Sequence, residues 1–290
     1  MEYAIHIIIM ISIYAILCMA ANLLTGMVNY ISLAFAAFYG VGAYLTALSI
    51  ILLKFSFFPT LALIVLINST IALLIVIPTL KLKGDYFILA TLGLQVIIYN
   101  IFYNWTNVTK GPYGISGITN PIFIGSITIN STLSFLGLGL ILAVISAGIF
   151  YKLIYSPFGR VLRGIRDDEI SLLSLGRNVA YFKTMAFIIS SAFCGIAGYI
   201  YASYISYIDP SSFTLDESIF ILSALLIGGT GNLKGPIFGA IFVVLIPEIF
   251  RFVGLPDSIG APLKQVFYGS SLVLIMFFRK QGIAGAINFH

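Results

Sequence analysis

The fold class is decided by residues 3–24, which read YAIHIIIMISIYAILCMAANLL and contain no Asp, Glu, Lys or Arg. An apolar run of about 18 or more residues without charge is typical of a helix that crosses a membrane. The rest of the chain has the same character, because hydrophobic residues make up 60% of its 290 positions and charged residues only 9%. Soluble domains carry about 25% charged residues. The sequence therefore predicts an all-α, polytopic membrane helix bundle and excludes soluble enzymes and nucleic-acid-binding proteins.

Further apolar segments follow the first one along the whole chain. They cover residues 31–53, 60–80, 86–103, 133–154, 184–207, 218–229, 236–253 and 263–279. At about 20 residues per crossing, we expect about 8–10 transmembrane helices in one domain over residues 1–290. The segment 218–229 is short and ends in two glycines, which favours a broken or re-entrant element. Glu2 stands where a cleavable signal peptide needs positive charge, so the first run is expected to remain as a helix.

The basic residues predict the orientation of the bundle. With the N-terminus outside and the segment after the fifth span inside, four basic residues lie outside: Lys54, Lys110, Arg251 and Lys264. The other eleven of the 15 lie inside, as expected for a protein of the prokaryotic plasma or inner membrane. In this orientation Asp209, Asp216 and Glu217 are expected in an external loop.

A long external connection is predicted over residues 104–132. Its segment 110–117 contains three glycines and a proline, which favour tight, non-helical backbone. Loops of this length are usually either functional or disordered. The apolar residues Ile115, Ile118, Ile122, Phe123 and Ile124 favour a folded or membrane-dipping lid over a disordered loop.

A second long connection, residues 155–183, holds eight of the 25 charged residues and is predicted to be cytoplasmic. Ser156 and Pro157 are a typical helix start, with serine as the N-cap and proline at the first helical position. Arg160, Arg163 and Arg166 then recur at every third position, which places them on one helical face. We expect this basic face to point at anionic lipid headgroups or at a partner protein.

The segment from Asp167 to Gly176 is predicted to be a separate short helix. Its acidic start suits the positive end of a helix dipole, and Gly176 is placed to end the helix in a left-handed cap. An apolar face runs between these ends, formed by Ile170, Leu172, Leu173 and Leu175. Docking into another protein is the favoured explanation, and a helix that rests on the bilayer surface is the alternative.

Several ordered motifs resemble one known family. They are SPFGRVLRGIRDDE at 156–169, LGRNV at 175–179, LKLKGDYF at 80–87, GPYGI at 111–115 and GGTGNLKGP at 228–236. Together they resemble LivM-type permeases, the membrane subunits of branched-chain amino acid ABC importers. The resemblance implies that the short helix couples the chain to cytoplasmic ATPase subunits through Asp167, Asp168, Glu169, Ile170, Ser171, Leu172, Leu173 and Gly176. The family's Glu-Ala-Ala motif is altered here, since Ser171 and Leu172 replace the alanines.

The resemblance also implies the partners of the chain. They are two ATPase subunits, an extracytoplasmic solute-binding protein and a second homologous permease, with a heterodimer favoured, all around a bilayer-embedded bundle and without nucleic acid. The chain itself contains no Gly-x-x-x-x-Gly-Lys-Ser/Thr phosphate loop. It is therefore expected to be a transport subunit and not an enzyme, to bind no cofactor, and to depend on ATP used by its partners. With only two cysteines and two histidines, no metal site is expected.

Polar and small residues within the spans are candidates for a translocation path. These candidates are Asn22, Asn29, Gly40, Gly42 and Gln95. For the glycines, close helix packing is the favoured alternative. No charged pair is predicted at mid-membrane, which counts against a proton-coupled or sodium-coupled carrier. The expected function is alternating-access import of branched-chain amino acids, with urea as another candidate solute, and the alternative is a channel or secondary carrier that works without ATPase subunits.

Overall fold

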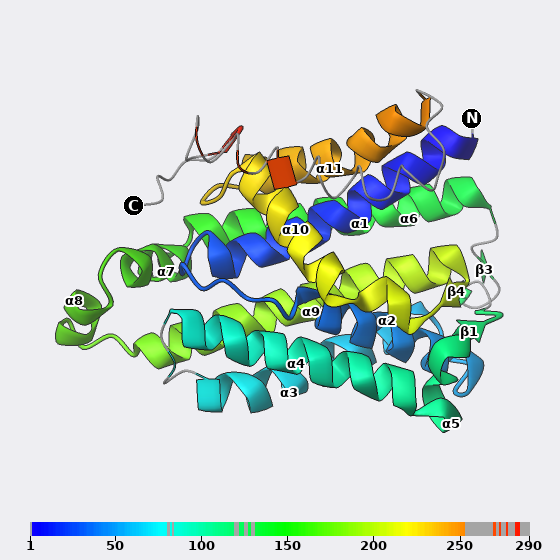
Figure 1. The fold of residues 1–290 in the computed structure, drawn as a ribbon, viewed down its shortest axis with the longest axis horizontal. Coiled ribbons are helices and arrows are strands. Elements are labelled where there is room, and N and C mark those ends of the chain that lie inside the picture. The colour runs from blue at the N-terminus through cyan, green and yellow to red at the C-terminus, as the bar shows by residue number, and fades with distance from the viewer. Residues whose placement is uncertain are drawn as a thin grey trace.

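The computed structural model describes residues 2–79, 82, 84–118, 122–124, 127–128, 131–252, 269–270, 273, 277 and 282–284. These residues form an elongated bundle in which the longest helices run roughly along a common axis (Figure 1). The α-helices are α1 (Glu2–Thr25), α2 (Phe35–Ile51), α3 (Phe57–Thr79), α4 (Asp85–Asn104), α5 (Thr106–Thr109), α6 (Thr132–Tyr155), α7 (Pro157–Asp167), α8 (Glu169–Ser174), α9 (Val179–Ile205), α10 (Leu215–Gly228) and α11 (Lys234–Phe252). Two 3-10 helices, η1 (Gly111–Tyr113) and η2 (Pro210–Phe213), and four short strands complete the description.

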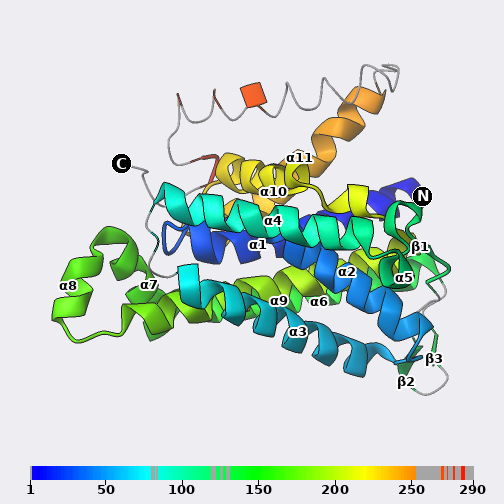
Figure 2. The same cartoon turned by 60° about the horizontal axis from the view of Figure 1, so that its bottom comes forward.

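Five of the helices are long and apolar enough to cross a membrane, namely α1, α3, α4, α6 and α9. Their bounds agree with five of the predicted spans, and the all-α membrane bundle is confirmed. The helices α10 and α11 lie on one side of the bundle and α3 lies on the opposite side, with α2 and α9 between them (Figure 2). Most of the last predicted span, 263–279, lies outside the described residues.

Helix α2 begins near the middle of the bundle, which corrects the prediction of a full span over 31–53. Residues 26–34 are not helical, and Asn29 adopts a left-handed backbone with φ of 63°. The amide of Ala36 donates a hydrogen bond to Ser218 Oγ at 2.9 Å, and Ser218 Oγ lies 3.4 Å from Oε1 of Gln95, at the centre of α4. The chain therefore reaches mid-depth as a non-helical segment before α2 starts.

Helix α10 also begins at mid-depth, after a segment that enters from the other end of the bundle. This segment contains β4 (Tyr207–Ile208) and η2, and Gln95 Nε2 donates to the carbonyl oxygen of Phe213 at 2.8 Å. Helix α10 has only 14 residues, which agrees with the short element predicted at 218–229. The segments 26–34 and 206–214, neither of which contains α-helix, thus meet at the centre of the bundle around Gln95 and Ser218. We call them the two non-helical segments.

The mid-depth start of α10 changes the expected position of Glu217. The sequence predicts this residue in an external loop, and this prediction is wrong. In the structure the hydroxyl of Tyr14 donates to Glu217 Oε1 at 2.7 Å, and Tyr14 lies at the centre of the 24-residue helix α1. The carboxylate of Glu217 is therefore at mid-depth, because 206–214 folds back into the bundle before α10 begins.

The central helices α2 and α9 pack through glycines. A Cβ atom added at Gly42 would lie 2.3 Å from the carbonyl oxygen of Gly195, and one at Gly198 would lie 2.2 Å from the carbonyl oxygen of Tyr39. Such contacts place two helix backbones against each other, which is how helices gain dispersion energy within a membrane. The small residues of α2 are therefore part of a tight helix interface.

The predicted external loop is folded in its described parts. Helix α5 and η1 lead into β1 (Ile115–Ser116), which pairs antiparallel with β4, and a second pair joins β2 (Ile122–Ile124) to β3 (Ile127–Thr128). Gly114 has a φ of 67°, and a Cβ atom there would lie 2.4 Å from the carbonyl oxygen of Ile208. The β1–β4 pairing connects this loop directly to the segment that descends to mid-depth.

Candidate functional site

The candidate coupling site lies at the end of the bundle opposite the strands, where α7 and α8 project from the membrane helices (Figure 1). Helix α7 starts as predicted, with Ser156 Oγ accepting from the amide of Gly159 at 3.4 Å and Pro157 at the first helical position. Leu162 and Ile165 bury the inner face of α7. The projecting segment is therefore anchored to the bundle and is not a free loop.

Two of the three arginines of α7 turn back towards the membrane helices. Arg163 Nη2 donates to the carbonyl oxygen of Ile154 at 3.2 Å, and Arg166 Nη1 donates to that of Gly26 at 2.7 Å. Arg160 is the exposed member of the group. Because carbonyl groups at helix ends lack partners within the helix and carry partial negative charge, Arg163 and Arg166 stabilise the ends of α6 and α1. Burial lowers the pKa of Arg166, while the neighbouring carboxylate of Asp167 acts to raise it.

Helix α8 begins at the predicted acidic cluster, and Asp168 is its N-cap. One oxygen of Asp168 accepts from the amides of Ile170 at 2.9 Å and Ser171 at 3.3 Å, and the Ser171 hydroxyl donates to the other oxygen. The Ser171 hydroxyl, followed by these amides, lowers the pKa of Asp168 below its usual value. The capping carboxylate is therefore charged at neutral pH, and its stabilising bonds are lost only as the pH falls through its lowered pKa.

The apolar residues of α8 divide between two directions. Leu172 packs inward on α7, because a Cβ atom added at Gly164 would lie 3.0 Å from Leu172 Cδ1. Ile170 and Leu175 are each 75% exposed, and Leu173 is 54% exposed. We call these three residues the apolar tip. Helix α8 and its C-cap residue Leu175 thus present three aliphatic side chains to their surroundings.

Gly176 ends α8 in the predicted manner. Its φ of 74° is left-handed, its amide donates to the carbonyl oxygen of Leu173 at 3.0 Å, and the amide of Arg177 donates to that of Leu172 at 3.1 Å. This arrangement matches a left-handed helix cap, which favours glycine because other residues are strained there. The length of α8 is therefore fixed at both ends by local sequence.

A buried lysine connects α8 to the segment that leads to α2. Lys183 is only 4% exposed, and its Nζ atom lies 2.8 Å from Glu169 Oε1. The same Nζ atom donates to the Tyr30 hydroxyl at 2.6 Å and lies 4.5 Å from the centre of the Tyr30 ring. Tyr30 in turn packs on Phe87 of α4, with ring centres 4.7 Å apart. Lys183 therefore joins α8, α9 and residues 26–34 through one ammonium group.

The contacts of Lys183 predict a measurable stability effect. Replacing Lys183 by methionine is expected to lower the free energy of unfolding by about 2 kcal/mol, because one partner of a buried pair is removed. The loss should stay below that of a fully buried pair, since Glu169 is 32% exposed. Thermal unfolding of the purified protein measures the change, with Lys152→Met as the control at an exposed lysine. Equal unfolding temperatures for both variants would contradict the role of Lys183.

The glycine-rich segment 228–235 forms a turn between α10 and α11 and not a phosphate loop. Asn22 Oδ1 accepts from the amide of Gly231 at 3.0 Å, and Asn22 Nδ2 donates to the carbonyl oxygen of Asn232 at 2.8 Å. The amide of Gly235 donates to Asn232 Oδ1 at 2.8 Å. Two amides that a phosphate would need are therefore already bound, and Asn22, a candidate path residue, serves to hold this turn.

The other candidate path residues occupy different places. Asn29 is exposed on the 26–34 segment, and Gln95 is buried where the two non-helical segments meet. Gly40 packs against Phe102 and Phe213, since a Cβ atom there would lie 2.8 Å from Phe102 Cε2. Gly42 packs on α9. The structure thus places both glycines in helix contacts, and the path role of all five residues stays a prediction.

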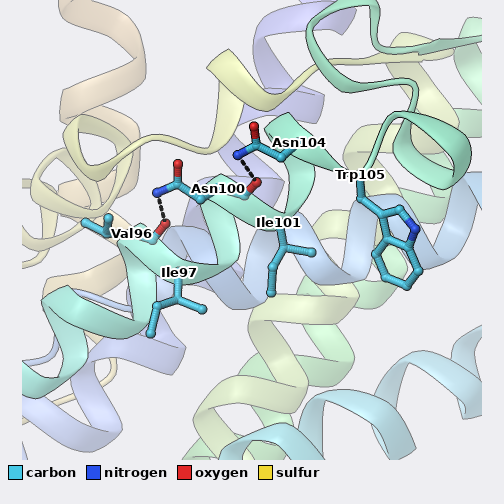
Figure 3. Close-up of a pocket in the computed structure, with 6 residues that line it drawn as sticks. All are labelled: Val96, Ile97, Asn100, Ile101, Asn104 and Trp105. Carbon is cyan, nitrogen blue, oxygen red and sulfur yellow. Dashed lines mark hydrogen bonds between the residues drawn. The ribbon is translucent and has the colours of Figure 1, made fainter.

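A shallow groove of about 540 Å³ lies on the exposed face of α4 near its end (Figure 3). Its walls include Trp105, which is 55% exposed, together with aliphatic side chains and two asparagines. Asn100 Nδ2 donates to the carbonyl oxygen of Val96 at 2.8 Å, and Asn104 Nδ2 donates to that of Asn100 at 2.9 Å. Since both amides bond to the helix itself, the groove offers a solute few free polar groups.

Three residues of this site were not among those predicted from the sequence: Lys183, Tyr30 and Gly26. Lys183 follows Glu169 by 14 positions, and no spacing rule connects them once a helix end and a turn intervene. Tyr30 and Gly26 lie more than 130 positions away from their partners. One signal in the sequence pointed to Lys183, which stands at the start of an apolar segment. Burying a lysine there is costly unless its charge is paired.

Among the residues that the structure describes, no group of three or more His, Cys, Asp or Glu side chains is placed to hold a metal ion. Cys18 and Cys194 are both free and buried. The described geometry is that of a membrane bundle with a projecting apolar tip.

Comparisons with known proteins match nearly the whole chain. The family model described as branched-chain amino acid transport system / permease component matches residues 3–276. The high-affinity branched-chain amino acid transport system permease protein LivM of Salmonella typhimurium is 32% identical over 94% of this chain and 68% of its own length. A probable LivM of Methanocaldococcus jannaschii is 27% identical over 75% of this chain and 65% of its own. The autoinducer 2 import system permease protein LsrC of Salmonella typhi is 28% identical over 58% and 48%, respectively. No solved structure matches.

Proposed function

Since the chain belongs to the family of branched-chain amino acid transport system permease components, we propose that it is the permease subunit of an ABC importer that translocates branched-chain amino acids. The observation that carries the coupling part of this proposal is the apolar tip on α8. Three exposed aliphatic side chains outside the membrane helices lose contact with water only when another surface covers them. A cleft on an ATPase subunit is the proposed cover.

The proposed mechanism is alternating access. ATP binding and hydrolysis move two cytoplasmic ATPase subunits, and α8 moves with the cleft that holds its apolar tip. The ion pair of Lys183 with Glu169 and the bond from Arg166 to Gly26 then pass this movement to residues 26–34. These residues lead to the start of α2 at mid-depth, so the movement arrives where the two non-helical segments meet.

The remaining partners follow from the same proposal. A second homologous permease completes the path across the bilayer, with a heterodimer favoured, and an extracytoplasmic binding protein delivers the solute. The far end of the bundle, where β1 pairs with β4, is the proposed contact for that binding protein. Branched-chain amino acids are the proposed solute. The relatives named above differ in their solutes, since they include an autoinducer 2 import permease as well as amino acid permeases.

Transport in proteoliposomes tests this function. The chain is reconstituted with a partner permease, the two ATPase subunits and the binding protein, and uptake of radiolabelled leucine is followed with and without ATP. We expect accumulation only when the ATPase subunits and ATP are both present. Leucine uptake by the permease alone, along its gradient and without ATPase subunits, would instead identify a channel or secondary carrier. Uptake of urea in place of leucine would retain the importer and change the solute.

A further inference from the structure

Glu217 is a carboxylate inside the membrane bundle whose function the coupling mechanism leaves open. It is half-buried in the first turn of α10, and its hydrogen bond from Tyr14 places it at the middle of α1. A carboxylate at this depth is costly, and such residues usually face a protein interior or a water-filled path. Its place in the first turn of α10 is at the positive end of the helix dipole, where negative charge is favoured.

Helix capping does not account for Glu217. The sequence Thr214-Leu215-Asp216-Glu217 has the spacing of a capping box, in which the Glu side chain bonds back to the backbone of the first residue. In the structure the Thr214 side chain makes no capping bond, and the Glu217 carboxylate accepts from Tyr14 on another helix. The carboxylate is thus directed away from its own helix end and towards α1.

Aromatic rings surround this position. Tyr14 packs edge-on against Phe220, with ring centres 5.3 Å apart, and Tyr39 packs on Tyr201, with ring centres 5.5 Å apart. The rings of Tyr39 and Tyr201 also pack on Phe213, shortly before α10, with ring centres 5.1 Å away for Tyr39 and 5.9 Å away for Tyr201. Within the described part of the chain, no lysine or arginine forms an ion pair with Glu217. A carboxylate beside aromatic rings is a suitable environment for a cationic group, through ion pairing and cation–π attraction.

We propose that Glu217, oriented by Tyr14, binds the protonated amino group of the solute during its passage through the bundle. This inference rests on the proposed import function and adds a specificity residue to it. The ligand class is a small solute with an ammonium group, as in an amino acid. The site would not favour urea or a neutral sugar-like solute, since neither carries a cation for the carboxylate.

The test compares Glu217→Gln with Asp216→Asn in the complete reconstituted transporter. Glutamine keeps an oxygen that can accept from Tyr14, so the fold is preserved while the charge is removed. Uptake of radiolabelled leucine at saturating binding protein is expected to fall about tenfold in Glu217→Gln, the loss of one charge-assisted bond of roughly 1.4 kcal/mol. The exposed neighbour Asp216 should give wild-type uptake when replaced. Tyr14→Phe, which keeps the charge, should reduce uptake less than Glu217→Gln does.

Two further measurements separate substrate binding from a structural role. The unfolding temperature and the amount of ATPase subunits that co-purify should stay near wild type in Glu217→Gln. Wild-type uptake by this variant, or a fall in uptake that is matched by losses of both stability and co-purification, would overturn the proposal. Lys264→Gln tests whether a lysine outside the described residues pairs with Glu217, because equal losses in the two single variants and no further loss in the double variant would also overturn it. If the wild-type transporter fails to import leucine, the proposed function fails first, which is a different outcome.

Discussion

Ile170→Asp is expected to abolish ATP-dependent uptake while leaving the membrane bundle folded. Ile170 is 75% exposed and belongs to the apolar tip. We therefore expect its replacement to disturb little of the packing within the permease. In the complex, however, the new carboxylate would have to enter an apolar cleft. Truncating or charging a central interface residue typically costs about 2 kcal/mol or more, and a buried unpaired charge costs more again. A loss of about 2 kcal/mol in binding free energy corresponds to about a thirtyfold fall in affinity. We expect leucine uptake to fall by at least this factor.

Two measurements show whether the loss arises from coupling. Co-purification of the ATPase subunits with the permease should fall together with uptake, and the unfolding temperature of the permease alone should not change. Tyr113→Asp is the matched control for co-purification and for the unfolding temperature, because Tyr113 is 88% exposed at the opposite end of the bundle, away from the apolar tip. A variant Ile170→Asp that binds its ATPase subunits and imports leucine normally would show that the apolar tip does not dock there.

A second substitution at the same position distinguishes protein docking from contact with the bilayer surface. Ile170→Lys should damage uptake as much as Ile170→Asp if the tip enters a protein cleft, because either charge is buried there. If α8 rests on anionic lipid, lysine should be tolerated far better than aspartate, since cationic residues are attracted to such surfaces. Leu172 is unsuited to this experiment because it packs on α7 at Gly164.

Gly42→Ala is expected to have the largest effect on folding. A single Cβ atom at Gly42 would lie 2.3 Å from the carbonyl oxygen and 2.5 Å from Cα of Gly195, both of them backbone atoms that cannot rotate away. The helices α2 and α9 would have to separate along their shared interface. We expect a loss of about 3 kcal/mol or more in the free energy of unfolding, at the upper end for overpacking in a core.

Gly137→Ala provides the matched control for this substitution. Gly137 lies within α6, and a Cβ atom there would meet nothing within 4 Å. The same chemical change should therefore be neutral or slightly stabilising, since alanine favours helix over glycine by about 1 kcal/mol. The yield of monodisperse protein and its unfolding temperature measure both variants. Similar behaviour of Gly42→Ala and Gly137→Ala would contradict the close approach of α2 and α9.

The long spans and the coupling segment were predictable because their signals are local. Apolar runs of about 20 residues predict helices such as α3 and α6 wherever they occur. The bounds of α8 follow from an acidic N-cap at Asp168 and a left-handed glycine at Gly176, which act over one helical turn. Physical chemistry within a few residues decides these features, so one sequence suffices to find them.

The arrangement at the centre was not predictable for the opposite reason. Hydropathy does not distinguish a helix from an apolar chain that enters the bundle without helical structure, so residues 31–34 were included in a span. Glu217 was placed outside for the same reason, and its contact with Tyr14 joins residues 203 positions apart. The turn of Arg166 towards Gly26 likewise depends on the packing of α7 against the end of α1. These contacts arise from tertiary packing, which no local pattern encodes.

The mid-depth start of α2 has a mechanical consequence. A continuous helix that crosses the whole bilayer is stiff, so a displacement of one end tilts the entire helix. Here α2 begins at mid-depth, and residues 26–34 lead into it as irregular chain. An extended chain spans up to about 3.3–3.6 Å per residue, whereas a helix spans about 1.5 Å per residue. Residues 26–34 can therefore lengthen or shorten without breaking a ladder of helical hydrogen bonds. If the proposed alternating access holds, we expect this segment to let one half of the bundle change shape while the half towards β1 and β4 stays in place.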